Sequence, residues 1–172
     1  SGKLPFTFPV RLEDNPAIAL DAYPGDGKQV EYKEGIFVGY RWYDRERIKP
    51  LFCFGHGLSY TTFEYGKVTA EGRQMGPDGT ITVSVPVKNT GSRAGAEIVQ
   101  LYVSDLKSSL PRPVKELKGF RKITLQPGQE QTVSFTIDRK ALSFYDDTKQ
   151  EWVAEPGAFE AMVGASACDI RG

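Results

Sequence analysis

The chain has 172 residues, of which 40% are hydrophobic and 26% charged, an ordinary composition for a globular protein. Its 22 Lys and Arg balance 22 Asp and Glu, and no long basic run favours nucleic-acid binding. No apolar run approaches the roughly 20 residues that cross a membrane. The sequence shows no signal-peptide pattern and begins at Ser1 without methionine, so we expect it to be part of a longer protein.

The first 33 residues show little periodic pattern. Four prolines disfavour helix in this region, at Pro5, Pro9, Pro16 and Pro24. The run LPFTFPV at 4–10 predicts one short extended segment, and the stretch has no adequate core of its own. We interpret it as the last piece of a preceding domain; a disordered leader is the alternative, which the apolar LPFTF disfavours.

Residues 34–63, EGIFVGYRWYDRERIKPLFCFGHGLSYTTF, combine aromatic residues with glycines. This mixture is typical of an ordered connector, because aromatic faces are buried while glycines let the backbone turn. We predict interdomain packing for four aromatic residues that lie among apolar neighbours: Phe37, Tyr40, Trp42 and Tyr43. A platform on which sugar rings stack is the alternative for these residues.

From about Thr62 onward, apolar residues alternate with a period of two and turn signals recur between them. The alternation is clearest at 80–87, 97–105 and 132–137, and further strands are expected at 62–68, 117–125, 143–153 and 158–165. Pro86 suggests an edge position or a bulge. About seven strands predict an all-β fold, an antiparallel β-sandwich of the immunoglobulin or fibronectin type III-like kind.

The sequence offers little catalytic chemistry. His56 is the only histidine and has no recognisable partners for a catalytic triad or a zinc site. Asp146 and Asp147 are adjacent, and adjacent strand residues point to opposite faces, which disfavours the paired carboxylates of a glycosidase. We predict no catalytic residue, no metal site and no cofactor. Cys53 and Cys168 lie outside any CxxC motif; they could pair, but two free thiols are favoured.

Several long motifs resemble the C-terminal part of glycoside hydrolase family 3 enzymes of the β-glucosidase type. They are GKLPFTFP at 2–9, EGIFVGYRWYD at 34–44, FGHGLSYTTFEY at 54–65, VKNTGSRAGAEIVQLYVSD at 87–105 and PRPVKELKGFRKITLQPGQ at 111–129. The resemblance covers nearly the whole chain. It implies three parts: 1–20 is the remnant of a preceding α/β-sandwich domain, 21–61 the connector, and 62–172 a fibronectin type III-like domain.

The resemblance also implies a function. No motif matches the family's nucleophilic aspartate or its acid/base glutamate, so we expect a non-catalytic accessory domain that stabilises a retaining β-glucosidase-like hydrolase. Its partners would be the catalytic domains of that enzyme, in a secreted or periplasmic location, with the loop Ser104–Val114 reaching toward the substrate entrance. Cys53 departs from the family pattern, which often has proline before the Phe-Gly pair.

Two other functions stay open. A carbohydrate-binding module would need a row of exposed aromatic residues, for which the sequence offers Tyr102, Phe120, Phe144, Tyr145 and Trp152. An immunoglobulin-like interaction or adhesion domain is the third possibility. If the aromatic residues of the connector pack on an absent partner, the isolated chain is expected to self-associate.

Overall fold

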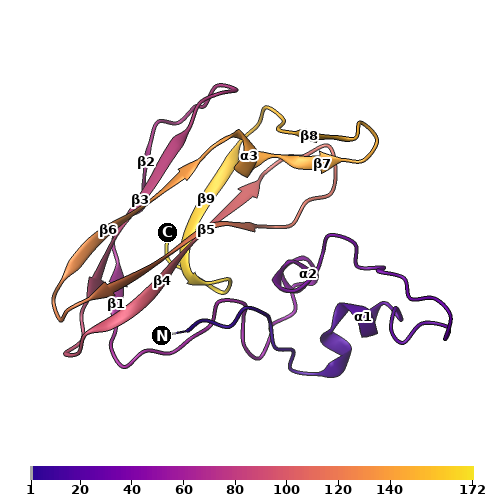
Figure 1. Ribbon diagram of the computed structural model, residues 1–172, viewed down its shortest axis with the longest axis horizontal. Coiled ribbons are helices and arrows are strands. Elements are labelled where there is room, and N and C mark those ends of the chain that lie inside the picture. Colours follow the sequence, from indigo (N-terminus) through magenta and orange to yellow (C-terminus); the bar gives the residue numbers. More distant parts are fainter. Residues whose placement is uncertain (1) are drawn as a thin grey trace.

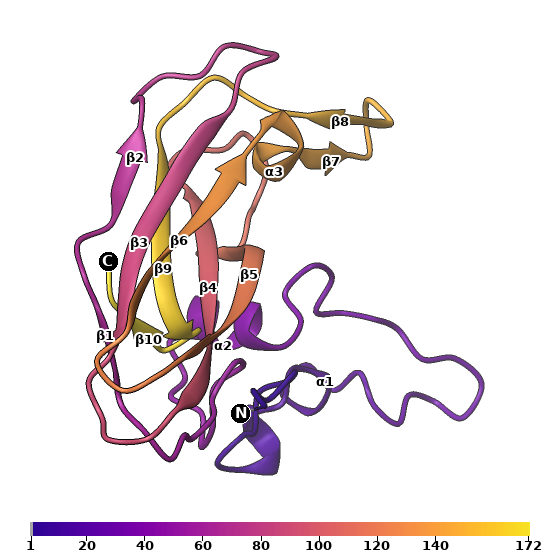
Figure 2. The ribbon, with the colours of Figure 1, turned by 60° about the vertical axis from the view of Figure 1, so that its left-hand side comes forward.

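The computed structural model describes residues 2–172, and its core is an antiparallel β-sandwich. Two four-stranded sheets pack face to face (Figures 1 and 2). One sheet holds β1 (Phe63–Tyr65), β2 (Thr69–Glu71), β3 (Ile81–Asn89) and β6 (Glu130–Ile137); the other holds β4 (Gly95–Asp105), β5 (Glu116–Leu125), β9 (Phe159–Ser166) and β10 (Asp169–Ile170). The prediction of an all-β sandwich is confirmed.

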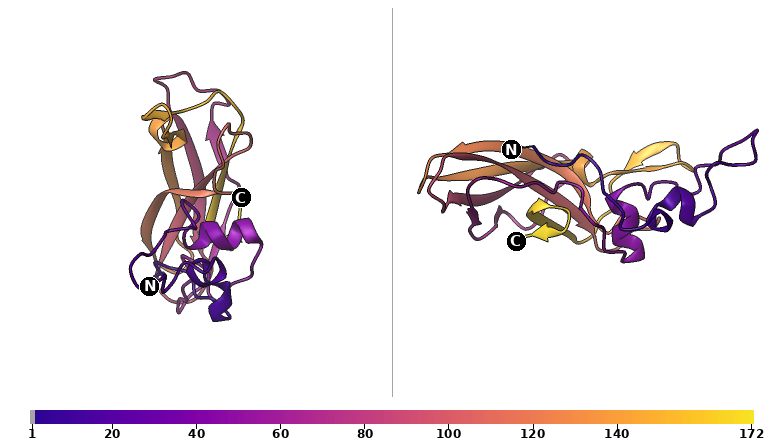
Figure 3. Two further views of the ribbon diagram at one scale, coloured as in Figure 1. Left: turned by 90° about the vertical axis from the view of Figure 1, so that its right-hand side faces the viewer. Right: turned by 90° about the horizontal axis from the view of Figure 1, so that it is seen from below.

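The helices are short and lie mostly before the sandwich. They are the 3-10 turn η1 (Leu12–Asp14), α1 (Pro16–Ala19), α2 (Tyr40–Glu46) and α3 (Arg139–Leu142). Figure 3 shows η1, α1 and α2 at one end of the long axis of the sandwich, in a segment that runs from the N-terminus to β1. We call residues 2–62 the N-terminal segment.

The core follows the predicted alternation. The inward residues of β3 and β6 meet those of β4, β5 and β9, so that the two sheets share one apolar layer. The buried set comprises Val83, Val85, Val87, Val99, Leu101, Val103, Ile123, Leu125, Val133, Phe135, Ile137 and Val163.

Pro86 lies in a central strand, and the expectation of an edge position was wrong. The strand β3 pairs with β6 along its whole length, while β1 and β2 share its other side. Pro86 falls where β1 has ended and β2 has not begun, and its carbonyl accepts a hydrogen bond from the Gly66 amide at 2.8 Å. Pro86 has no amide hydrogen to donate, and at this position neither β1 nor β2 requires one.

The expected strand at 143–153 is also different in the structure. It divides into a hairpin of two short strands, β7 (Phe144–Asp146) and β8 (Glu151–Val153), which stands outside both sheets. The Asp146 carboxylate accepts hydrogen bonds from the amides of Thr148 and Lys149 and so stabilises the turn between the strands. These polar residues act in the turn and interrupt the apolar alternation.

Asn89 ends β3 with a fully buried and fully paired amide. Its side-chain nitrogen donates to the carbonyls of Arg93 and Leu125, at 2.8 and 3.0 Å. Its side-chain oxygen accepts from the Thr61 hydroxyl at 2.7 Å and the Gly91 amide at 3.1 Å. One side chain thus joins the end of the N-terminal segment to both sheets.

Replacing Asn89 with leucine should lower the free energy of unfolding by about 2–3 kcal/mol, because buried partners lose their hydrogen bonds. Chemical denaturation followed by circular dichroism measures the change. Thr90→Ala, a change at the exposed neighbouring position, serves as the control and should stay within about 0.5 kcal/mol of the wild type. Equal effects of the two variants would contradict the role given to Asn89.

Candidate functional site

The strand β4 is buried on both faces, although a strand of a two-layer sandwich normally has one face in water. Its inner face belongs to the core, while its outer face presents Gln100, Tyr102 and Ser104, which are buried as well. The N-terminal segment covers this outer face. The surface where the two meet is the candidate functional site, and we call it the joint.

Tyr40, on α2, packs directly on the sandwich. Its ring lies 5.1 Å from that of Phe54 and 5.9 Å from that of Tyr102, measured between centroids. Its hydroxyl oxygen accepts a hydrogen bond from the Leu117 amide at 2.8 Å. Tyr102 is fully buried, and this burial raises the pKa of its hydroxyl above the ordinary value of 10.0.

The other three predicted packing residues, Phe37, Trp42 and Tyr43, belong to the N-terminal segment as well, and the contacts described for Phe37 and Trp42 lie within it. Trp42 and Tyr43 are buried, and the Trp42 indole nitrogen donates to the Asp14 carbonyl at 3.2 Å. Phe37 is half-buried, with the Arg45 guanidinium 4.1 Å from its ring centroid. Tyr40, Trp42 and Tyr43 thus find much of their cover within this chain.

The helix α2 was not predicted from the sequence. It has only seven residues and no side-chain hydrogen bond at its N-cap, and Arg47 ends it in the left-handed conformation at φ 55°. A signal was nevertheless present: Tyr40, Tyr43 and Asp44 follow the i, i+3, i+4 spacing of one helical face.

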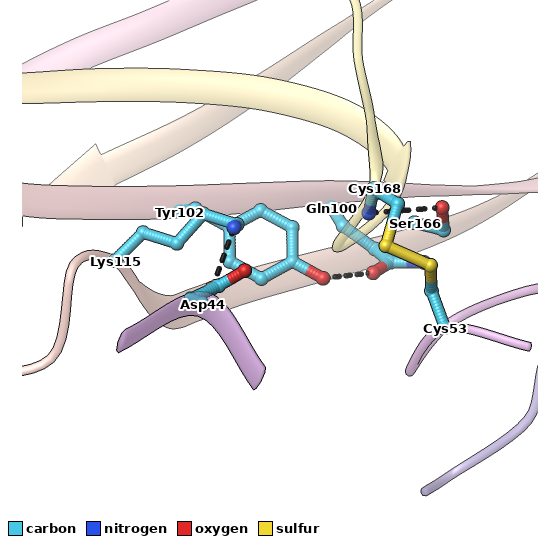
Figure 4. Close-up of a disulfide and its surroundings, with 7 residues drawn as sticks. All are labelled: Asp44, Cys53, Gln100, Tyr102, Lys115, Ser166 and Cys168. Atoms are coloured by element: carbon cyan, nitrogen blue, oxygen red, sulfur yellow. Dashed lines mark hydrogen bonds and ion pairs between the residues drawn. A yellow bond between two sulfur atoms is a disulfide. The ribbon is translucent and has the colours of Figure 1, made fainter. Parts of the chain in front are cut away.

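A disulfide between Cys53 and Cys168 closes the joint, so the expectation of two free thiols was wrong (Figure 4). The two Cα atoms are 6.1 Å apart, across a sequence separation of 115 residues. The turn before β1 and the turn between β9 and β10 must meet for this pair to form. Sequence spacing carries no information about that meeting, which is why the pairing could not be predicted.

Gln100 lies beside the disulfide and fixes the approach of the two chain segments. Its side-chain nitrogen donates to the carbonyl of Ala165 at 2.8 Å, and its oxygen accepts from the Tyr102 hydroxyl. Gly55 lies against this amide with φ of +80°, and a Cβ there would come within 2.5 Å of the Gln100 oxygen. Only glycine fits at position 55 without a shift.

Ion pairs attach the N-terminal segment to the sandwich at its start and at α2. The Lys3 ammonium lies 2.8 Å from the Glu97 carboxylate. The Lys115 ammonium lies 2.6 Å from the Asp44 carboxylate on α2 (Figure 4). Side chains in both pairs are largely excluded from water, and buried pairs are screened less than surface pairs.

Arg112 is the centre of a larger charged cluster at the edge of the joint. Its guanidinium contacts the carboxylates of Asp105 at 3.0 Å and Glu116 at 2.6 Å, and it donates to the Leu142 carbonyl at 3.0 Å. Arg41 on α2 reaches the same Glu116 at 3.4 Å. The cluster therefore connects the helix, the loop after β4 and the start of β5.

Glu116 has a pKa below its ordinary value of 4.5. Burial alone pushes this pKa upward, but the hydrogen bond from Arg112 and the charges of Lys118, Arg112 and Arg41 together outweigh it. Because the pKa of Glu116 is lower in the folded chain than in the unfolded chain, its ionised carboxylate stabilises the fold at every pH above the pKa of the unfolded chain. That stabilisation is lost as the pH falls through the lower pKa of the folded chain.

Acid should therefore weaken the joint in a way that depends on Glu116. We expect the melting temperature of the wild type to fall more steeply below about pH 4.5 than that of Glu116→Gln, which has no carboxylate to protonate at this position. Melting curves recorded from pH 6 to pH 3 measure the two slopes. Glu71→Gln, an exposed change on β2, should keep the wild-type slope. A Glu116→Gln slope equal to that of the wild type would contradict the role of this carboxylate.

The other side of the N-terminal segment is apolar and exposed. Phe8 and Phe52 form an isolated antiparallel bridge, with ring centroids 6.1 Å apart, and Phe6 lies 4.7 Å from Phe8. Leu51 adjoins them, and its amide donates to the Phe8 carbonyl. These four side chains are between 39% and 58% exposed. We call them the outer apolar strip.

The remaining candidates of the sequence lie apart from the joint or serve packing. The His56 ring lies 5.1 Å from that of Phe52. The described residues hold no group of three potential metal ligands, and none of their helices is long and apolar enough to cross a membrane. Among the five aromatics proposed for a sugar-binding row, Tyr102 is buried and Phe144 half-buried, so these five do not form one exposed row.

Three comparisons with known proteins agree with this architecture. A family model described as "Fibronectin type III-like domain" matches residues 97–167. The chain is 58% identical over 174 residues to β-glucosidase BoGH3A of Bacteroides ovatus, covering 100% of this chain and 23% of that protein. It is 53% identical over 170 residues to thermostable β-glucosidase B of Acetivibrio thermocellus, covering 99% and 22%. The crystal structure of a GH3 β-glucosidase from Bifidobacterium adolescentis superimposes with a TM-score of 0.90 and 38% identity, over 98% of this chain and 24% of that one.

The β-sandwich, the joint and the family match together define the class of protein. This chain carries a fibronectin type III-like domain with a segment packed against it. It corresponds over its whole length to the C-terminal region of glycoside hydrolase family 3 β-glucosidases. It spans between 22% and 24% of the length of these three relatives.

Proposed function

We propose that this chain is the non-catalytic accessory domain of a larger, retaining β-glucosidase-like hydrolase, and that it stabilises the catalytic domains of that enzyme. One observation carries the proposal: the N-terminal segment has two different sides. Its inner side is joined to the sandwich by a disulfide and ion pairs. Its outer side leaves the outer apolar strip in water, and adjoining apolar side chains of this kind mark an interaction surface.

In this proposal the chain has the three parts that the sequence suggested, namely 1–20, 21–61 and 62–172. The aromatic residues of the middle part link the other two. The Trp42 indole donates a hydrogen bond to the Asp14 carbonyl in the first part, and the Tyr40 ring packs on Tyr102 in the third. The four aromatics then serve interdomain packing, while the outer apolar strip faces the catalytic domains. The disulfide supports a secreted or periplasmic location, because disulfides persist in oxidising compartments.

Charge placed in the outer apolar strip tests this function. The double variant Phe6→Asp with Phe52→Asp should destabilise the full-length enzyme by roughly 1–3 kcal/mol, since it buries unpaired carboxylates between domains. In the isolated 172-residue chain the same change should cost much less, because both side chains are already exposed. Thermal unfolding of both proteins gives the comparison.

Two results would overturn the proposal. One is an equal loss of stability in the full-length enzyme and in the isolated chain, which would mean that no second domain covers the strip. The other is hydrolysis of an aryl-β-glucoside by the isolated chain, at a rate that scales with its concentration and survives repurification.

A further inference from the structure

The β7–β8 hairpin carries two large aromatic side chains on its outward face. Tyr145 and Trp152 are direct cross-strand partners, with ring centroids 5.8 Å apart and an angle of 69° between the ring planes. Trp152 is 67% exposed and Tyr145 51%. Figures 1 and 2 show the hairpin projecting beyond the sheets and separate from α1 and α2. This aromatic pair is distinct from the outer apolar strip.

The hairpin is held firmly from its other face. Phe144 lies there under the Arg112 guanidinium, which is 5.4 Å from the ring centroid. Glu155, just after β8, accepts a hydrogen bond from the Ser109 amide at 2.9 Å, which ties the hairpin to the loop after β4. Tyr145 and Trp152 therefore project from an anchored support, and such preorganisation lowers the entropy lost on binding.

The size of this face favours a small ligand. Each strand has three residues, and only Tyr145 and Trp152 point outward from the hairpin strands. Two such side chains offer roughly 150–250 Å² each, whereas a stable protein interface needs about 800 Å² on each partner. The turn beside them presents Asp147 and Gln150, which are both exposed.

We propose that Tyr145 and Trp152 form a surface site for a β-linked glucan chain. This inference rests on the proposed function, in which the parent enzyme acts on β-glucosides. The exposed aromatic faces suit the C–H faces of pyranose rings, which are apolar and nearly flat, and the exposed turn residues Asp147 and Gln150 supply polar groups for the sugar hydroxyls. The site holds substrate or product chains near the enzyme and takes no part in bond cleavage.

The chain provides its own optical probe, because it has two tryptophans and Trp42 is only 4% exposed. Titration of the 172-residue chain with cellohexaose or laminarihexaose should give a saturable blue shift of the Trp152 emission, and maltohexaose should give a weaker one. Tyr145→Ala should lower the affinity about tenfold, which corresponds to about 1.4 kcal/mol. Phe120→Ala is the matched control, since Phe120 is also 67% exposed but lies on β5.

Trp152→Ala in the full-length enzyme separates binding from packing. It should reduce retention on an insoluble β-glucan while leaving the melting temperature and the turnover of an aryl-β-glucoside unchanged. The inference is overturned if neither hexaose shifts the emission, if Phe120→Ala weakens binding as much as Tyr145→Ala, or if Trp152→Ala lowers the melting temperature of the full-length enzyme. The last result would show that another domain covers the pair. None of these results depends on the outer apolar strip, so failure here leaves the stabilising function standing.

Discussion

Replacing Cys53 and Cys168 together with serine should lower the free energy of unfolding by about 5 kcal/mol, the chain-entropy value for a loop of this size. The disulfide joins residues separated by 115 positions, so its loss frees the unfolded chain more than the loss of a short-range bridge would. Urea denaturation with and without reductant measures the effect. Reduction should bring the wild type close to the double variant and leave the variant itself unchanged.

A control at the same joint distinguishes loop closure from local packing. Cys53 adjoins Phe54, and Phe54→Leu removes aromatic contact with Tyr40 while leaving the bridge intact. Reduction of the disulfide should lower the stability of Phe54→Leu by the same amount as that of the wild type. A double serine variant as stable as the oxidised wild type would show that the bridge contributes nothing to the joint.

The second large effect is expected at Arg112. Arg112→Met should cost about 3–5 kcal/mol, because it leaves the carboxylates of Asp105 and Glu116 buried without their cation. The side chain of Asp105 is only 2% exposed, so water cannot replace the lost partner easily. Thermal and urea unfolding of the isolated chain measure the change.

Lys149→Met is the matched control for Arg112→Met. It also removes a cation from a carboxylate, but the Lys149 side chain is 55% exposed, and an exposed pair contributes at most about 1 kcal/mol. Neutralising the orphaned partners with Asp105→Asn and Glu116→Gln should recover part of the stability of Arg112→Met. If Arg112→Met and Lys149→Met cost the same, the cluster does not stabilise the joint.

The sandwich could be predicted from the sequence because its strands alternate clearly. Val83, Val85 and Val87 of β3 all point into the core. So do three alternating residues of β4 (Val99, Leu101 and Val103) and three of β6 (Val133, Phe135 and Ile137). Pro86 misled the prediction, because the neighbouring strand is broken at that point and accommodates a proline in the middle of the sheet.

The joint could be predicted only in part. The aromatic residues of the connector were singled out, but the cover they give to β4 was not, because Gln100 and Tyr102 have the polar and amphipathic character of an outward face. The disulfide depends on two distant turns that meet in space. Tyr145 and Trp152 become neighbours only through the hairpin that places them side by side, and their separation of seven positions in the sequence does not indicate this contact.

The order of synthesis has a consequence for the joint. Lys3, Tyr40 and Cys53 leave the ribosome long before the strands on which they pack. The Gln100 side chain donates a hydrogen bond to the Ala165 carbonyl, and the Phe54 carbonyl accepts one from the Ala167 amide. Cys53 forms its disulfide with Cys168. The hydrogen bonds beside the disulfide, and the disulfide itself, therefore form only after β9 and the turn that follows it have been made, whereas Tyr40 can pack on β4 and β5 before then.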